Sequence, residues 1–150
     1  MAREVVLGEV KVRPMGTEDI EAILAIDRKI TGRDRAATFH RRVDAYLATD
    51  PLVCRVAEID GKIIGFMLGD IKGWEYGAPE AGWIEVMAVD PEYQRNGVGG
   101  KLAESLFDHF QRLGMKRVYT LVDWADGHLL SYFKSLGFKR SDLINLEKDL

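Results

Sequence analysis

Hydrophobic positions in the first third of the chain follow one alternating run and then two helical stripes. The segment 9–13 alternates valines with polar residues, which predicts a short strand. A stripe over 20–30 follows Thr17, a suitable N-cap, and Gly32 is placed to end that helix. A second stripe over 39–47 predicts another helix.

Two β-rich runs, 52–59 and 62–70, flank the dipeptide Asp60-Gly61, which favours a two-residue hairpin turn. We therefore expect these runs to pair as antiparallel strands. Residues 71–81 contain several glycines and aromatic residues without any period, so they predict an exposed loop. A further strand is predicted over 83–89.

The last third of the chain begins with its longest helical stripe, over 98–113, which Gly114 is placed to cap. The strand before this helix and a strand predicted over 118–122 form a βαβ unit, whose strands run parallel. A short helix over 127–136 and a last strand over 142–148 complete the chain. Hairpins followed by one βαβ unit predict an α/β protein with a mixed sheet and helices on both faces.

Composition narrows the class of protein. The chain has 150 residues, 47% of them hydrophobic, and a formal net charge of −3. We expect one domain over residues 1–150. Nucleic acid is not an expected partner, because its binding relies on a surplus of Lys and Arg. Hydrophobic runs are far shorter than the roughly 20 residues of a membrane span, and the N-terminal segment does not resemble a secretory signal. We therefore expect a cytoplasmic protein with no membrane partner.

Cysteine and histidine do not suggest a metal centre. Cys54 is the only cysteine, which excludes an intramolecular disulfide and a zinc site built from several cysteines. Its β-rich surroundings predict a small core residue. His40, His109 and His128 are not spaced as metal ligands. We expect no bound metal.

The glycine-rich segment 94–101 lies between a predicted strand and the N-terminus of a predicted helix. Open backbone N–H groups and the positive end of a helix dipole make such a turn suitable for an anion. Two better-known phosphate loops do not fit. The dinucleotide fingerprint and the P-loop both fail at Leu102, and the P-loop also lacks its first glycine at Arg95.

Two segments resemble a known family. The segment 86–99, VMAVDPEYQRNGVG, is similar to motif A of the GCN5-related N-acetyltransferases (GNAT family), whose core is Q/R-x-x-G-x-G/A, and the segment 132–138, YFKSLGF, resembles their motif B. The order of predicted elements agrees over nearly the whole chain. The resemblance implies the GNAT fold, a mostly antiparallel sheet of six to seven strands in which one parallel pair splays apart. It also implies an acetyl-CoA-dependent N-acetyltransferase, in which an amine attacks the thioester directly.

The resemblance also implies how the acyl donor is held. In that family the glycine-rich turn binds the pyrophosphate of acetyl-CoA, and the pantetheine arm lies along the backbone of the preceding strand. Asp126 stands where the family has an asparagine, so it either contacts the donor or caps the last helix. The other positions assigned to the donor are Met87, Ala88 and Val89 on the strand, and Gln94, Arg95, Asn96, Gly97, Val98, Gly99, Gly100 and Lys101 in the turn.

An amine must be neutral to attack a thioester, and an alkylamine with a pKa of about 10.4 is mostly protonated at pH 7. Glu85 is the first candidate for the base, because strand alternation predicts that it shares a face with Trp83 and Met87. Asp123 is a second candidate. The resemblance suggests that a backbone N–H near Met87 or Ala88 polarises the thioester carbonyl.

The candidate general acid departs from the family pattern. Phe133 occupies the position of a family tyrosine and falls on the apolar stripe of its helix, whereas Tyr132 offers a hydroxyl one residue earlier. Relatives that acetylate a ribosomal protein N-terminus pair that tyrosine with a glutamate at the position of Leu121. Both residues differ here, which argues against that substrate class. Tyr132 is the candidate for protonating the leaving sulfur.

The acceptor side is expected to include the loop residues Trp74, Glu75 and Tyr76. The resemblance implies a small molecule or peptide that bears an amine, and the sequence leaves its identity and a homodimer open. Two alternatives also stay open. One is a CoA-binding regulatory or interaction module without catalysis, and the other is transfer of an acyl group longer than acetyl.

Overall fold

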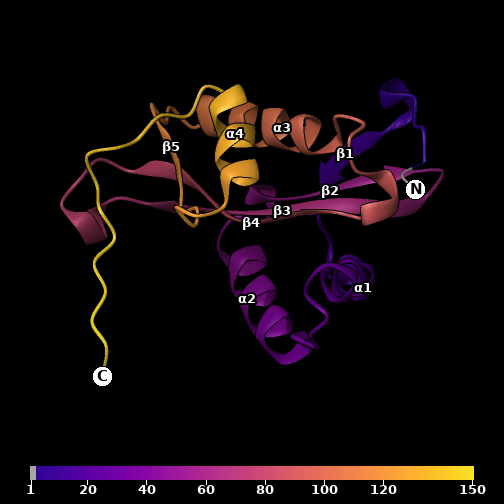
Figure 1. Ribbon diagram of the computed structural model, residues 1–150, viewed down its shortest axis with the longest axis horizontal. Coiled ribbons are helices and arrows are strands. Elements are labelled where there is room, and N and C mark those ends of the chain that lie inside the picture. Colours follow the sequence, from indigo (N-terminus) through magenta and orange to yellow (C-terminus); the bar gives the residue numbers. More distant parts are fainter. Residues whose placement is uncertain (1–2) are drawn as a thin grey trace.

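Within residues 3–150, the part of the chain that the computed structural model describes, five strands form one sheet in the order β1-β2-β3-β4-β5 (Figure 1). Neighbouring strands from β1 to β4 are antiparallel, and β5 runs parallel to β4. The predicted mixed sheet with one parallel pair is confirmed. The strands are β1 Lys11–Pro14, β2 Cys54–Ile59, β3 Lys62–Lys72, β4 Ala81–Val89 and β5 Val118–Thr120.

Helices cover both faces of this sheet, as predicted. Figure 1 shows α1 and α2 on one face and α3 and α4 on the other. The helices are α1 Ile20–Thr31, α2 Ala36–Thr49, α3 Val98–Arg112 and α4 Gly127–Ser135. Short 3₁₀ turns connect the elements: η1 Leu7–Glu9, η2 Thr17–Asp19, η3 Pro51–Val53, η4 Trp74–Tyr76 and η5 Pro91–Tyr93.

Local turn chemistry sets several of these boundaries. Asp60 and Gly61 have φ angles of 49° and 77°, the positive values that a type I′ hairpin turn requires between β2 and β3. Gly32 ends α1 with φ 68°, and its N–H donates to the carbonyl of Arg28. Gly114 follows α3 with φ 81°. The hairpin and both helix ends lie where the sequence predicts them.

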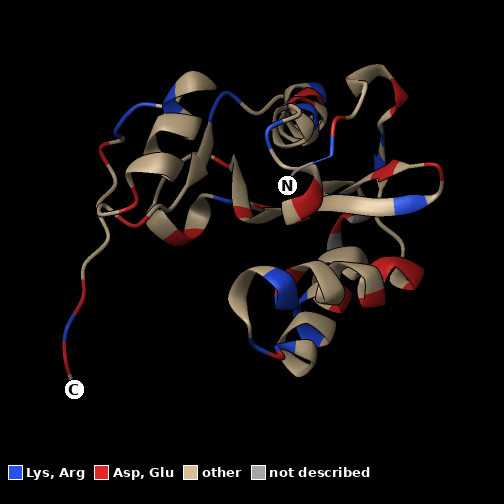
Figure 2. Cartoon of the chain, turned by 45° about the vertical axis from the view of Figure 1, so that its right-hand side comes forward, with Lys and Arg blue, Asp and Glu red and all other residues tan. Residues whose placement is uncertain are grey.

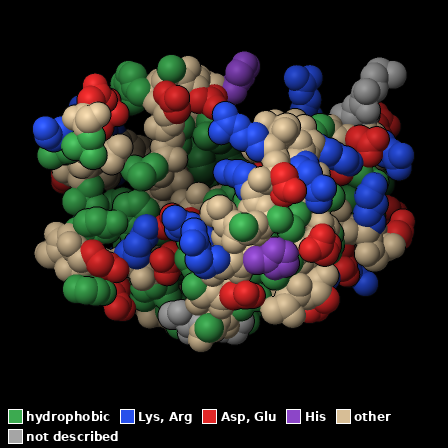
Figure 3. Space-filling model, turned by 90° about the horizontal axis from the view of Figure 1, so that it is seen from below, with side chains coloured by type: hydrophobic (Ala, Val, Ile, Leu, Met, Phe, Trp, Pro, Cys, Tyr) green, Lys and Arg blue, Asp and Glu red, His purple; other side chains and the backbone are tan. Residues whose placement is uncertain are grey.

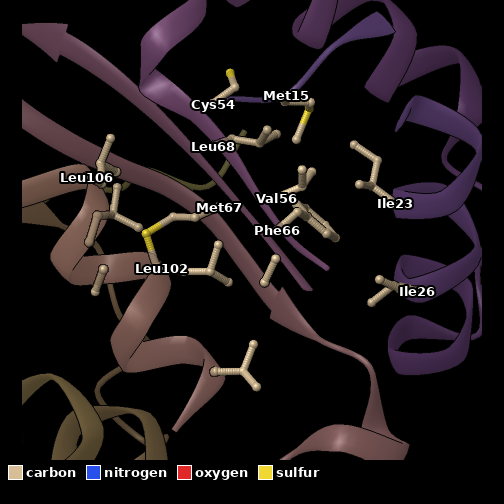
Figure 4. Close-up of a cluster of buried hydrophobic side chains, with 14 of the residues drawn as sticks. Met15, Ile23, Ile26, Cys54, Val56, Phe66, Met67, Leu68, Leu102 and Leu106 are labelled. Atoms are coloured by element: carbon tan, nitrogen blue, oxygen red, sulfur yellow. The ribbon is translucent and has the colours of Figure 1, made fainter. Parts of the chain in front are cut away.

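The core has two layers, one on each face of the sheet (Figure 4). Phe66 of β3 points toward α1, the helix that contributes Ile23, whereas the next residue, Met67, points toward Leu102 of α3. This alternation is the ordinary pattern of a strand buried on both faces. Cys54 is also fully buried, as expected for a small hydrophobic residue.

A charged contact joins β1 to the start of α1. The guanidinium of Arg13 donates to both carboxylate oxygens of Asp19 at 2.8 and 2.9 Å, and the N–H of Gly16 donates to the same carboxylate at 2.8 Å. The Arg13 hydrogen bond holds the pKa of buried Asp19 below its usual value, even though burial opposes this. The contact fixes where the first helix leaves the sheet.

The strand predicted over 142–148 is wrong. Residues 139–150 form no strand or helix in the described structure, and Figures 1 and 2 show them leaving the body of the molecule. Ile144 and Leu146 are 66% and 83% exposed. The alternating pattern is present, but a strand also needs a neighbouring edge to pair with, and this segment does not reach one. The sheet therefore has five strands among the described residues instead of six to seven.

Candidate functional site

The parallel strands β4 and β5 separate halfway along β4. Their pairing covers only Gly82 to Ile84 on β4, opposite Val118 to Thr120 on β5. From Val86 to Val89, β4 pairs with β3 alone. The predicted splay is therefore present, and it leaves one edge of the strand open beside a gap.

The hydrogen-bond phase of β4 decides which of its backbone groups face this gap. The N–H of Asp90 donates to the carbonyl of Ile64 on the β3 side at 2.8 Å. Bonded and non-bonded pairs alternate in an antiparallel ladder, so Ala88 also faces β3, whereas Met87 and Val89 face the gap. Consistently, the carbonyl of Val89 accepts from the side-chain amide of Gln94 at 3.1 Å. Among the two predicted N–H donors, geometry favours Met87 over Ala88.

The gap leads to the turn before α3. Arg95 and Gly97 have positive φ angles of 65° and 81°, and within the described structure no side chain caps the N-terminus of the helix. The first intrahelical bond runs from the N–H of Lys101 to the carbonyl of Gly97, which leaves the preceding N–H groups of α3 available. A Cβ added to Gly100 would meet no atom within 4 Å. This open, uncapped helix start fits a bound pyrophosphate.

Two polar side chains of the turn have structural contacts. The Asn96 amide nitrogen donates to the carbonyls of Arg3, Tyr93 and Gln94 at 2.8, 3.1 and 3.1 Å, and its oxygen accepts from the N–H of Val5 at 3.1 Å. The Lys101 side chain also points toward the N-terminal segment. Asn96 thus fastens residues 3–5 to the turn.

The Lys101 ammonium donates to the carbonyl of Leu7 at 3.1 Å and also to that of Val10. Both acceptors lie in the N-terminal segment. In this arrangement the Lys101 side chain stabilises the turn on the side of the N-terminal segment. The positive charge that faces a bound anion comes from the N-terminus of α3.

Tyr132 of α4 faces the first turn of α3. Its hydroxyl oxygen lies 3.0 Å from the position that a Cβ would take on Gly99. This oxygen is buried and has no hydrogen-bond partner in residues 3–150. Burial raises the pKa of Tyr132 to about 12, so the hydroxyl keeps its proton at neutral pH. Phe133 is instead buried in the core, with its ring 5.1 Å from that of Phe138, as its place on the apolar stripe predicts.

Glu85 is the extra residue of a β-bulge in β4. Leu68 of β3 pairs with Val86, but the next residue, Gly69, pairs with Ile84. Glu85 therefore has no opposite residue on β3. A bulge of this kind interrupts the alternation of faces along the strand and redirects the side chain.

This bulge corrects the predicted face of Met87. Met87 pairs with Met67, which points toward α3 (Figure 4). Glu85 instead forms an ion pair with Lys72, whose ammonium also lies 4.4 Å from the centroid of the Trp83 ring. Glu85 and Trp83 share a face, as predicted, whereas Met87 lies on the opposite one, because the bulge adds one residue to the count.

The surroundings of Glu85 are polar and partly buried. Burial opposes the charge on Lys72, but its hydrogen bond and ion pair with Glu85 outweigh that effect, and the pKa of Lys72 is raised. Burial raises the pKa of Asp70, and burial followed by the charge of Glu85 raises the pKa of Tyr46 on α2. Sequence reasoning missed Asp70 and Lys72. Asp70 and Lys72 are two residues apart on β3 and lie on the same face as Trp83. This spacing is the sequence signal that could have identified them.

Aromatic rings line the same side of the sheet. The Trp83 ring lies 5.7 Å from Tyr76 and 5.2 Å from Tyr119, centroid to centroid. Trp83 is only 7% exposed, and its indole N–H finds no partner in the part of the chain that is described. Trp74, by contrast, is 78% exposed. Figure 3 views the side of α1 and α2 and shows hydrophobic side chains gathered toward the end where η4 lies, beside a hollow in the surface.

The remaining acidic candidates make local contacts. Glu75 accepts from the N–H of Gly73 at 2.8 Å, and such backbone hydrogen bonds lower the pKa of Glu75. Exposed Asp123 accepts from the N–H of Ala125 at 2.8 Å. Asp126 caps α4, since its carboxylate accepts from the N–H of Leu129 at 2.9 Å. Asp126 therefore takes the capping role, one of the two that its sequence position left open.

Two classes of feature are absent from the described residues. No group of three or more His, Cys, Asp or Glu side chains there converges as a metal site would require. None of the helices in residues 3–150 is long and apolar enough to span a membrane.

Comparisons with known proteins agree with this geometry. Residues 20–138 match the model of the family described as Acetyltransferase (GNAT) family. The ribosomal protein bS18-alanine N-acetyltransferase of Escherichia coli is 33% identical over 57 residues, which cover 38% of this chain and 38% of that protein. Mycothiol acetyltransferase of Thermobispora bispora is 32% identical over 92 residues, which cover 61% of this chain and 31% of that protein. The chain thus spans less than half the length of these curated relatives.

Solved structures share the fold. The aminoglycoside N-acetyltransferase AAC(6')-Iy in complex with CoA has a TM-score of 0.80 and 16% identity, covering 93% of this chain and 94% of that chain. Ard1 from Thermoplasma volcanium has a TM-score of 0.75 and 19% identity, covering 89% of this chain and 84% of that chain. The implied GNAT fold is confirmed.

Proposed function

Because the chain belongs to the acetyltransferase (GNAT) family, we propose that it transfers an acetyl group from acetyl-CoA to a primary amine. The amine nitrogen forms a bond to the acetyl carbon, the carbon–sulfur bond breaks, and CoA leaves as the thiol. No covalent enzyme intermediate is needed. The observation that carries the proposal is the open edge of β4, which runs from Glu85 to the uncapped N-terminus of α3.

The donor is proposed to lie along this edge. The available N–H groups at the start of α3 would hold its pyrophosphate, and the gap-facing groups of Met87 and Val89 would pair with the pantetheine arm. When bound, acetyl-CoA supplies an activated thioester carbonyl. The Met87 N–H is proposed to donate a hydrogen bond to that carbonyl oxygen and to stabilise the negative charge that develops there.

Glu85 is proposed as the general base. Its carboxylate lies on the α2 side of β4, next to the gap, and forms an ion pair with Lys72. A base is useful because an alkylamine is mostly protonated near neutral pH. The amine would approach from the face of Trp83, opposite the face on which Tyr132 lies.

Tyr132 is proposed as the general acid for the leaving sulfur. Its buried hydroxyl lies against the first turn of α3 and stays protonated, with a pKa of about 12. A thiol with a pKa of about 8.5 leaves without much assistance, so this contribution is expected to be small. Asp123 is assigned no proton transfer, because its carboxylate accepts a hydrogen bond from the N–H of Ala125 in its own turn.

The acceptor is proposed to be a small cationic amine. Tyr76, Trp83 and Tyr119 form an aromatic wall, and the carboxylates of Asp70 and Glu85 lie on the same face. Rings and carboxylates together suit an ammonium group bound before deprotonation. The similar proteins described above are named an aminoglycoside N-acetyltransferase, a mycothiol acetyltransferase and a ribosomal protein alanine N-acetyltransferase. Of the acceptors in these names, an aminoglycoside fits a small cationic amine best.

The proposal is tested by measuring product formation from acetyl-CoA with a panel of aminoglycosides, polyamines, amino acids and peptides. Glu85→Gln should keep CoA affinity and lower kcat by about 100-fold near pH 7. The deficit should shrink as pH approaches the pKa of the amine, because a neutral amine no longer needs the base. Exposed Glu104 of α3 gives the matched control, since Glu104→Gln should leave kcat unchanged.

Tight CoA binding with no turnover on any amine would overturn the proposal and favour the non-catalytic module. A deficit of Glu85→Gln that is the same at every pH would refute the base role alone. Faster transfer from a longer acyl-CoA would show that acetyl-CoA is not the preferred donor. The proposed direct attack of the amine on the thioester would be unaffected.

A further inference from the structure

The side chain of Lys72, the last residue of β3, reaches across the face of the sheet to β4. Its ammonium forms an ion pair with Glu85 and lies 4.4 Å from the centroid of the Trp83 ring. Both side chains of the ion pair are mostly buried, with exposed fractions of 22% for Lys72 and 25% for Glu85. Lys72 is therefore held on the face from which the acceptor amine is proposed to approach.

The side-chain amine of Lys72 belongs to the same chemical class as the proposed acceptor. A lysine side chain is a primary alkylamine with an ordinary pKa of about 10.4. A general base must lie within hydrogen-bond reach of the proton that it removes, so the attacking nitrogen of any acceptor has to come next to the Glu85 carboxylate. The nitrogen of Lys72 already has this position. It therefore lies where the proposed mechanism places an attacking amine.

The other lysine of the same strand has different surroundings. Lys62 is exposed at the opposite end of β3, and its ammonium lies 5.2 Å from the centroid of the Tyr93 ring. Lysines that react with acetyl-CoA in free solution do so according to their exposure, which favours Lys62. A reaction that depends on contact with Glu85 favours Lys72 instead. The two lysines thus distinguish a catalysed modification from an uncatalysed one.

We propose that Lys72 is an acceptor of its own enzyme and that its side-chain nitrogen takes the acetyl group of acetyl-CoA bound to the same chain. This inference rests on the proposed acetyltransferase function. The ammonium gives one proton to Glu85, from which the proton passes to solvent. The nitrogen forms a bond to the acetyl carbon, the carbon–sulfur bond breaks, and a second proton leaves with the sulfur as the CoA thiol. The nitrogen keeps its last proton as an amide.

Acetylation of Lys72 changes what an external amine meets at the site. The amide of acetyl-lysine has no positive charge, so the ion pair with Glu85 is lost. The Glu85 carboxylate is then free to pair with a cationic acceptor, which no longer competes with the Lys72 ammonium. Self-acetylation therefore strengthens the binding of the class of acceptor proposed above.

The test is mass spectrometry of the full chain after incubation with acetyl-CoA and no added amine. We expect one acetyl group at Lys72, located by peptide mapping, and little at Lys62, although Lys62 is the more exposed of the two. The rate per chain should not change with protein concentration, because the reaction is intramolecular. Lys62→Arg is the matched control and should be modified at Lys72 at the normal rate.

A variant of the base tests whether the modification is catalysed. Glu85→Gln should slow the acetylation of Lys72 by about 100-fold, with CoA affinity measured on the same sample to show that the donor still binds. Turnover of an external amine by a chain whose Lys72 stays unmodified would overturn this inference and leave the proposed function standing. Acetylation of neither Lys72 nor any amine, with CoA bound, would overturn both.

Acetylation of Lys72 that is no faster than that of Lys62, or that is equally fast in Glu85→Gln, would be uncatalysed and would also overturn the inference. Steady-state kinetics give a second readout. Lys72→Gln lacks the charge, as acetyl-lysine does, whereas Lys72→Arg keeps a permanent positive charge for the ion pair. The KM for a cationic amine should be about threefold to fivefold lower in Lys72→Gln than in Lys72→Arg. Equal KM values would refute the effect on acceptor binding.

Discussion

The two halves of β4 differ in what surrounds their backbone. From Gly82 to Ile84 the strand lies between β3 and β5, and Gly82 donates its N–H to the carbonyl of Arg117 at 3.0 Å. From Glu85 onward the β5 side is open. One strand thus serves two purposes: its first half is satisfied within the protein, and its second half keeps backbone donors and acceptors for a ligand. Buried backbone groups are rarely left unpaired, so the open half is where a binding partner is expected.

The largest effect is expected in the paired half, from Gly82→Ala. A Cβ on Gly82 would lie 2.3 Å from the ring of Phe110, which is 1% exposed and has nowhere to move. We expect a loss of about 3 kcal/mol in the free energy of unfolding, measured by urea denaturation. Gly100→Ala is the control, since its Cβ meets nothing within 4 Å, and it should leave stability unchanged or slightly higher.

An equal loss of stability in both variants would contradict this expectation, because it would mean that contact with the Phe110 ring does not explain the cost at Gly82. A stable Gly82→Ala protein would mean that α3 can shift away from the sheet without cost.

The features of this molecule that depend on neighbouring residues could be predicted from the sequence. The Asp60-Gly61 turn, the end of α1 at Gly32 and the glycine-rich start of α3 are each determined by a few adjacent positions. The parallel pairing of β4 and β5 was also predictable, because the helix between them dictates the direction of return.

Features that depend on distant partners could not be predicted. The bulge at Glu85 arises from the register between β3 and β4, and no local residue signals it. Asn96 looks like a ligand-binding residue, but its amide bonds to Arg3 and Val5 from the far end of the chain. The strand pattern over 142–148 is real, yet whether it pairs depends on an edge elsewhere. An alternating pattern shows that a segment can form a strand, but it does not identify the strand with which that segment pairs.

The open half is tested by Met87→Pro, which removes the one N–H proposed to face the thioester. Proline is tolerated where a strand has no ladder bond on that side, so the fold should persist. We expect kcat to fall by about 100-fold to 1,000-fold, as when an oxyanion donor is lost. Met87→Leu keeps the N–H and should retain activity, which separates the backbone from the side chain.

Ala88→Pro sharpens the same comparison. Its N–H belongs to the β3 ladder, so this variant should lose stability, whereas Met87→Pro should lose activity. If both prolines merely unfold the protein, or if Met87→Pro is fully active, the assignment of the gap-facing groups is wrong.

The far end of the open edge is tested by Gly100→Leu. A Cβ at this position meets nothing within 4 Å, and the leucine side chain should occupy the space in front of the helix N-terminus. We expect CoA to bind about tenfold to 100-fold more weakly, the cost of losing a hydrogen bond to a charged group, measured by calorimetry. Asp108→Leu, at an exposed position two turns further along α3, should bind CoA normally. Unchanged binding by Gly100→Leu would move the pyrophosphate site elsewhere.

The smallest effect is expected from Tyr132→Phe. Because a thiol leaves readily, kcat should fall by no more than about tenfold. The variant should be as stable as the unaltered protein or slightly more so near pH 7, since the lost hydroxyl has no partner within residues 3–150. Thermal unfolding and steady-state rates measure the two effects.

Alkaline pH separates this tyrosine from the others. The folded pKa of Tyr132 is about 12 against an ordinary value of 10.0, so the unfolded chain loses the proton first. The stability of the unaltered protein should therefore fall as pH rises from 10 toward 12, and Tyr132→Phe should remove part of that fall. If the variant and the unaltered protein lose stability in parallel, the Tyr132 hydroxyl is not buried against α3. Solvent would then occupy the place beside the open half of β4 where Tyr132 was proposed to act as the general acid.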